Sequence, residues 1–168
     1  MGLFILVVAL RLAPHAPNFV PVGALALFAG AYFPKRWGYG VPLAAVLATD
    51  VLIGFYDLKL MAVVYLSHLL GVGLGYLMRS RVNTGNVLLG AVGGAVAFFL
   101  TTNFAVWLFS SWYAHTLPGL LLAYEYGLPF FRNTLLSNLV YSGAFFGVYE
   151  FAKRYVFKPG SELTKARA

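Results

Sequence analysis

Apolar residues dominate this chain in six runs, which are separated by short segments rich in proline, glycine and basic residues. The runs cover residues 3–12, 20–33, 38–55, 60–78, 87–109 and 134–155. Such runs are typical of membrane-spanning helices, which need about 20 apolar residues each. A longer, semi-polar connection precedes the last run and contains a short helical stretch at 117–128. The pattern predicts an all-α membrane protein, with one six-helix transmembrane bundle over residues 1–158 and a basic cytoplasmic tail at 159–168.

The first two runs are too short to cross a membrane. At 1.5 Å per residue, 3–12 covers about 15 Å and 20–33 about 21 Å, against a hydrocarbon core of roughly 30 Å. Between them lies RLAPHAPNF, in which Pro14 and Pro17 each remove an amide donor. Non-helical backbone at membrane depth must be shielded by protein or line a wet cavity. We therefore expect a short or broken first helix, followed by a segment that forms a cavity wall or lid.

Composition and charge agree with a multi-pass membrane protein. The chain is 61% hydrophobic and only 10% charged, and it contains no cysteine, which removes disulfides and thiol chemistry. The net charge of +7 comes from basic residues that flank the apolar runs, which argues against nucleic acid as a partner. Nine of the twelve basic residues fall on one side if both termini are cytoplasmic. The positive-inside rule therefore favours that orientation.

With this orientation, the polar side chains of the runs gather toward the outer surface. Charged groups at membrane depth are costly and by default indicate a functional site with a partner. Asp50 lies in the outer third of its run, while Arg11 and Arg132 lie at the outer ends of theirs. The candidate substrate-binding residues are Arg11, His15, Asn18, Asp50, Asn103, Trp107, Arg132 and Asn138.

Each of these residues also has a structural interpretation. Asp50 could pair with Arg11 or Arg132 only to hold helices together, whereas two arginines against one aspartate would suit an anionic ligand. Trp107 could anchor the protein at the membrane interface or stack on a flat heterocycle. Ser67 and His68, in the middle of the fourth run, are more typical of hydrogen bonding between helices than of a site.

Small residues recur at helical spacing in the second, fourth and fifth runs. The segments are GALALFAGA at 23–31, Ser67 with Gly71 and Gly75, and GAVGGAVA at 90–97. Such faces allow helices to approach closely. The pattern favours packing inside the bundle, with docking of another membrane subunit on the second run as the alternative.

Motifs for catalysis and energy supply are missing. The chain has no phosphate-binding loop, no HExxH and no nucleophilic serine in a GxSxG setting. We therefore expect neither an enzyme nor a bound cofactor, and three scattered histidines make a metal site unexpected.

Four segments carry a resemblance to a known family. They are RLAPHAPNFVPVGALALFAGAYFP, VPLAAVLATDVLIGF, TTNFAVWL and LPFFRNTLLSNLVYSGAFFG. The chain resembles small bacterial membrane proteins assigned to transport, which are related to the substrate-binding S components of energy-coupling factor vitamin transporters. In the smaller family the position of Asn138 commonly carries an aspartate.

The resemblance implies a six-helix fold with a site near the outer face, capped by 13–19 and 110–131. It also implies a transmembrane coupling subunit and ATPases as partners, with a homo-oligomer as the alternative. S components dock through an AxxxA motif in their first helix, whereas the nearest match here, Ala26 to Gly30, lies in the second run.

Together these observations predict a protein that captures a small vitamin-like, aromatic or anionic metabolite from outside and needs partners for energy. The alternative is a structural or assembly subunit of a membrane complex, in which the same charges merely pair helices. An intramembrane enzyme that uses Asp50 and His15 for acid–base chemistry is the least favoured interpretation.

Overall fold

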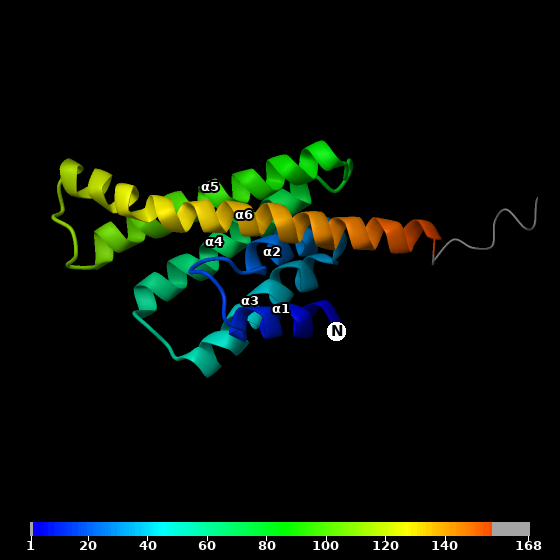
Figure 1. Cartoon of the computed structure of the whole chain (residues 1–168), viewed down its shortest axis with the longest axis horizontal. Coiled ribbons are helices and arrows are strands. Elements are labelled where there is room, and N and C mark those ends of the chain that lie inside the picture. The colour runs from blue at the N-terminus through cyan, green and yellow to red at the C-terminus, as the bar shows by residue number, and fades with distance from the viewer. Residues whose placement is uncertain (1, 156–168) are drawn as a thin grey trace, which may run out of the picture.

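The computed structural model describes residues 2–155, which form six α-helices and no strand within that range. The helices are α1 (Gly2–Leu12), α2 (Val22–Tyr32), α3 (Lys35–Ile53), α4 (Leu58–Leu77), α5 (Thr84–Phe109) and α6 (Leu117–Tyr155). The start of α1 and the end of α6 lie at one end of the molecule. The α3–α4 and α5–α6 connections lie toward the other end, and the α1–α2 connection faces the same way but lies nearer the middle of the molecule (Figure 1).

The helix boundaries follow local chemistry. Proline stands directly before α2 and α3, as Pro21 and Pro34, where the missing amide is no loss. Asp57 caps α4 by accepting from the amides of Lys59 and Leu60 at 2.9 and 3.0 Å. Helix α3 ends at Gly54, whose φ of 111° is readily available only to glycine. The expected short first helix is present, because α1 ends just before Pro14.

Helix α6 differs from the sequence-based expectation of two separate helical pieces. It runs unbroken for 39 residues with Pro129 inside it. A proline removes one amide donor but need not end a helix when both halves are held by a neighbour. Helix α5 packs along both halves: Leu100 accepts from the Tyr124 hydroxyl at 3.1 Å, and Phe99 packs on Phe131.

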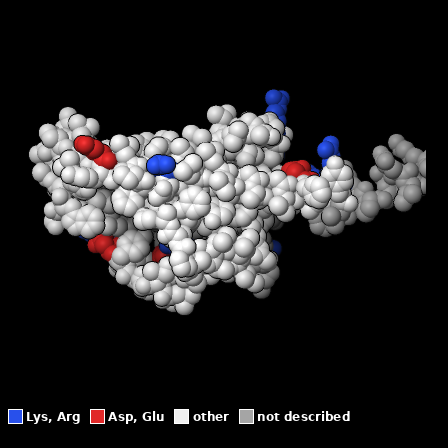
Figure 2. Space-filling model, in the orientation of Figure 1, with Lys and Arg blue, Asp and Glu red and all other residues white. Residues whose placement is uncertain are grey.

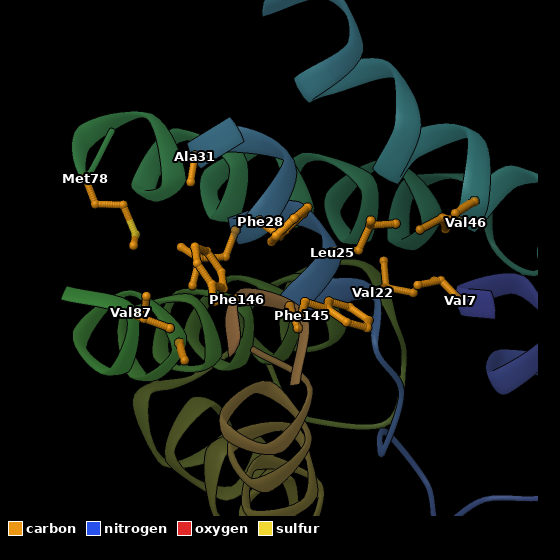
Figure 3. Packing of buried hydrophobic residues seen from close by; sticks show 14 residues of the cluster. Val7, Val22, Leu25, Phe28, Ala31, Val46, Met78, Val87, Phe145 and Phe146 are labelled. Carbon is orange, nitrogen blue, oxygen red and sulfur yellow. The ribbon is translucent and has the colours of Figure 1, made fainter. Parts of the chain in front are cut away.

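Helix α2 is the centre of the fold. It contacts each of the other five helices, and from Val22 to Ala31 only Gly23 is not fully buried. Phe28 is surrounded by aromatic rings, including Phe145 and Phe146 of α6 (Figure 3). Its 11 residues span about 16 Å, which is too short to cross a membrane. Because nearly all of these residues are buried, the helix is enclosed by the other helices.

The small residues of α2 serve packing against α4. A methyl group on Gly30 would collide with the backbone of Val72, and one on Gly75 would collide with the carbonyl of Leu27. The two backbones therefore meet directly. Because Ala26 and Ala29 are fully buried, this stripe is not available as the docking surface that the sequence left open.

The α2–α4 contact predicts a sharp difference between two glycines of α4. Gly75→Ala should destabilise the fold by about 2–3 kcal/mol, because neither backbone can move aside for the added methyl group. Gly73→Ala should cause no loss, since no atom lies within 4 Å of the new methyl group. Unfolding of the detergent-solubilised protein measures both, and equal stabilities would contradict the close contact.

Candidate functional site

An ion pair joins α1 to α3 and α4 near the α1–α2 connection. The Nη2 of Arg11 donates to Oδ1 of Asp50 at 2.7 Å, and its Nη1 donates to Oγ1 of Thr49 at 2.6 Å. The hydroxyl of Tyr65 donates to the other carboxylate oxygen at 2.8 Å. Asp50 is 2% exposed, so its charge is compensated by Arg11 and satisfied on both oxygens. The structure thus selects Arg11 as the partner of Asp50.

Arg11 is not saturated by these contacts. A guanidinium has five N–H donors, and here Nη1 makes two hydrogen bonds, one of them to the carbonyl of Val46 at 3.2 Å. Nη2 makes one, so that Nε–H and the second Nη2–H have no acceptor among residues 2–155. Arg11 lines the cavity described next, and these donors remain available to a ligand.

A cavity of about 290 Å³ lies beside this ion pair, over the N-terminal end of α2. Its walls come from α2, α4, α5 and α6. The ends of α1 and α3, at Arg11 and Ile53, and the connections 13–21 and 54–57 also line it. At about 30 Å³ per water molecule, it has room for roughly ten non-hydrogen atoms of a ligand. Known ligand pockets start near this size. The polar and aromatic residues that line it are Arg11, His15, Asn18, Tyr56, Ser67, His68, Phe98, Thr134, Ser137 and Asn138.

His68 is the most informative of these residues. It is 9% exposed, and its ring packs on Phe98 at 5.2 Å between centroids. No hydrogen bond of the described residues reaches either ring nitrogen, although buried polar groups are normally satisfied. In its neutral form the ring offers one donor and one acceptor to whatever fills the cavity.

Asn138 provides a second polar group on the opposite wall. Its Nδ2 donates to the carbonyl of Ala91 at 3.2 Å, whereas its Oδ1 accepts no hydrogen bond from the described residues. A methyl group on Gly23 would collide with that oxygen, so the glycine makes space for it. The two amide atoms therefore have separate roles, one in joining α6 to α5 and the other in lining the cavity.

The connection 13–21 is fastened across the cavity at several points. Nδ2 of Asn133 donates to the carbonyl of Pro17 at 2.9 Å, and Phe19 packs on Tyr141. Asn18 has a φ of 60°, a left-handed conformation that asparagine tolerates. Both ring nitrogens of His15 face carbonyl oxygens, of Arg11 at 3.0 Å and Ala16 at 2.9 Å. The connection is thus an ordered strap rather than a loose end.

The α3–α4 connection contributes Tyr56. Burial, and next the negative charge of Asp50, raise the pKa of Tyr56, so its hydroxyl stays protonated at neutral pH. It can therefore donate a hydrogen bond at the mouth of the cavity.

The structure separates the eight candidate residues into those at the cavity and those away from it. Four of them line the cavity: Arg11, His15, Asn18 and Asn138. Asp50 lies behind Arg11 and does not line it.

The other three lie away from the cavity. The side chain of Asn103 donates to Phe99 at 2.8 Å and packs against Gly127. Trp107 donates to the carbonyl of Ala114 at 2.9 Å and so fixes the α5–α6 connection. Arg132 is exposed. Their inclusion rested on their expected depth in the membrane, which does not fix how far apart two helices stand at that depth.

Sequence reasoning placed Ser67 and His68 between helices and passed over Phe98, Thr134 and Ser137 as site residues. Ser67 does form the expected interhelical hydrogen bond, with Thr101 at 2.7 Å, and it also lines the cavity. The signal that could have found His68 is its position, since it is the one His, Asp, Glu, Lys or Arg of α4 beyond the first turn of that helix.

No three His, Asp or Glu side chains of residues 2–155 lie close enough together to hold a metal ion.

Comparison with known proteins assigns the chain to a family. Residues 1–162 match a family of unknown function, DUF6580, and the chain belongs to that family. No curated protein and no solved structure matches the chain.

The ion pair makes a prediction about stability. Asp50→Asn should cost about 3 kcal/mol, because it leaves the Arg11 charge partly buried without its counter-ion. Asp57→Asn is the matched control, with an expected change near zero, since asparagine caps a helix about as well as aspartate. Equilibrium unfolding in mixed micelles tests both variants. Similar losses in the two would mean that the pair contributes nothing beyond a surface carboxylate.

Proposed function

We propose that this protein is a multi-pass protein of the bacterial plasma membrane that captures a small metabolite in the cavity beside Arg11. Partner subunits, or a second copy, would then supply the energy for transport. The observation that carries the proposal is the unpartnered His68 in a cavity of ligand size.

The outer surface of the helices supports membrane insertion. Two helices of the described residues, α4 and α5, are long and apolar enough to cross a membrane. Only 17% of the apolar window of α5 is buried within the protein, so this helix is not the core helix of a water-soluble fold. Uncharged side chains predominate on the face in Figure 2, and large apolar side chains are exposed along α3 to α6. The lipid of a bilayer would cover this surface. The bundle would then cross the bilayer, with all six helices contributing.

The charge distribution supports an orientation with the cavity outward. Lys35, Arg36, Arg79 and Arg81 lie at the end of the molecule that holds the start of α1. At the cavity end, Lys59 and Arg132 are exposed, while Arg11 is neutralised. The positive-inside rule then puts the cavity on the outer side.

The absence of cysteine makes this topology directly testable. A Ser111→Cys variant, in the α5–α6 connection, should react with a membrane-impermeant maleimide on intact cells. An Arg81→Cys variant, in the α4–α5 turn, should react only after permeabilisation. Both positions are exposed, so a difference reports sidedness rather than burial. Labelling of both on intact cells, or of Arg81→Cys alone, would contradict the orientation.

The geometry favours an aromatic or uncharged ligand over an anionic one. Among residues 2–155, Arg11 is the only arginine or lysine that lines the cavity, and its charge is already paired with Asp50. Arg132, which the sequence suggested as a second cation, does not line it. His68 and Phe98 place two aromatic rings in the lining, tilted by 33° to one another, and His68, Asn138 and Arg11 offer hydrogen bonds beside them. A small planar heterocycle with donors and acceptors on its edge fits this combination.

A ligand screen with charge-matched probes tests the proposal. Thermal unfolding of the purified protein should shift upward with uncharged heterocycles, such as nucleobases and pyridine carboxamides, and less with the corresponding pyridine carboxylates. A ligand at 100 times its Kd stabilises by about 2.7 kcal/mol. The shift should disappear in His68→Phe, which keeps an aromatic ring but removes both nitrogens.

His115→Phe is the matched control, because His115 lies in the α5–α6 connection and does not line the cavity. A flat response of the unaltered protein to the whole panel would favour the alternative, a structural subunit. In that role the Arg11–Asp50–Tyr65 contacts would serve only to hold α1, α3 and α4 together.

A further inference from the structure

A second hollow lies at the end of the molecule opposite the cavity, between α1 and the start of α3. It is an open groove of about 940 Å³ and is lined mainly by apolar side chains. Leu3 and Phe4 of α1 form one wall, Phe33 forms the base, and Trp37 and Val41 of α3 form the other wall. Helix α1 packs on α3 and only slightly on α2, and it contacts no other helix of residues 2–155. The groove between α1 and the start of α3 is therefore left open.

The mouth of the groove is cationic. Arg36 lines it, exposed and with its guanidinium carbon 5.6 Å from the centre of the Trp37 ring. Lys35 is its exposed neighbour at the start of α3. The ion pairs of the described residues are Arg11–Asp50 and Lys153–Glu150, so neither Lys35 nor Arg36 has a carboxylate partner there. Arg79 differs, because it donates to the carbonyls of Gly30 and Phe33 at the end of α2.

We propose that this groove binds an anionic phospholipid, with an acyl chain between α1 and α3 and the phosphate at Arg36. The inference goes beyond metabolite capture and rests on only one part of the proposed function, the insertion in a membrane. An apolar groove that faces a bilayer is filled by lipid rather than water. A phospholipid carries a phosphate joined to an apolar chain, which matches a cation at the mouth of an apolar groove. Tryptophan beside arginine is typical of the membrane interface, where that phosphate lies.

Lipid retention by the purified protein tests the charge component. The protein, stripped of lipid in a non-ionic detergent, is offered equal amounts of phosphatidylglycerol and phosphatidylcholine with identical acyl chains, and bound lipid is counted by native mass spectrometry. Phosphatidylglycerol should be preferred, and Arg36→Gln should lower the preference about fivefold, the effect of one cation near a membrane surface. Arg81→Gln, at the same end but outside the groove, should leave the preference unchanged.

Gly40 allows the groove itself to be tested. It lines the groove, and no atom lies within 4 Å of a methyl group placed on it, so Gly40→Leu should fold and project an added side chain into the groove, which narrows it. Retention of both lipids should then fall. Gly73→Leu is the control, because Gly73 is equally open but lies outside the groove.

Three results would overturn the proposal. They are equal retention of the two lipids by the unaltered protein, an Arg81→Gln effect as large as that of Arg36→Gln, and unchanged lipid retention in Gly40→Leu. The first would mean that lipid charge plays no part in retention, the second that diffuse surface charge rather than Arg36 sets the preference, and the third that the retained lipid does not lie in the groove. Because lipid retention is measured without any metabolite, failure of metabolite capture would leave these outcomes unaffected.

Discussion

The ion pair between Arg11 and Asp50 is the interaction on which the shape of the cavity depends. Helix α1 is only 11 residues long and packs mainly on α3. Its last turn is fixed by three hydrogen bonds from Arg11 to α3, and Tyr65 connects the same carboxylate to α4. The strap of residues 13–21 begins directly after this point. If α1 were free to slide along α3, the strap would have no fixed origin and the cavity no defined wall.

The cavity exists because the central helix starts late. Helix α2 begins at Val22, about halfway along the bundle, and the helices around it continue past its N-terminus (Figure 1). The space above that N-terminus is bounded by small residues, including Gly23, Ala26, Gly71 and Gly94. Larger side chains at these positions would fill it. The same short helix therefore supplies both the tightly packed core at one end and the hollow at the other.

The sequence predicted the elements of this arrangement better than their mutual distances. Six helices, the short first helix and the break after Arg11 all follow from hydrophobic run length and from proline, which act locally. Asn103 and Asn138 were both predicted to line one substrate site. In the structure the side-chain oxygen of Asn103 packs against Gly127 of α6, whereas Asn138 lines the cavity. Which polar residue reaches a cavity depends on where two helices diverge, and this is a property of packing that a single helix does not encode.

His68 shows the same limit from the other direction. A histidine in the middle of an apolar helix can be satisfied by a neighbouring helix, and Ser67, one residue earlier, is satisfied in this way by Thr101. The His68 ring packs on Phe98 of the same neighbouring helix, α5, which offers an aromatic face but no hydrogen-bond partner, so the hydroxyl finds a partner and the imidazole does not. The imidazole lines the cavity, so its unpaired nitrogens can bond to whatever fills that cavity. A ligand whose donor and acceptor match the ring makes hydrogen bonds there that an apolar ligand of the same size cannot make, which makes the unpaired ring a source of specificity.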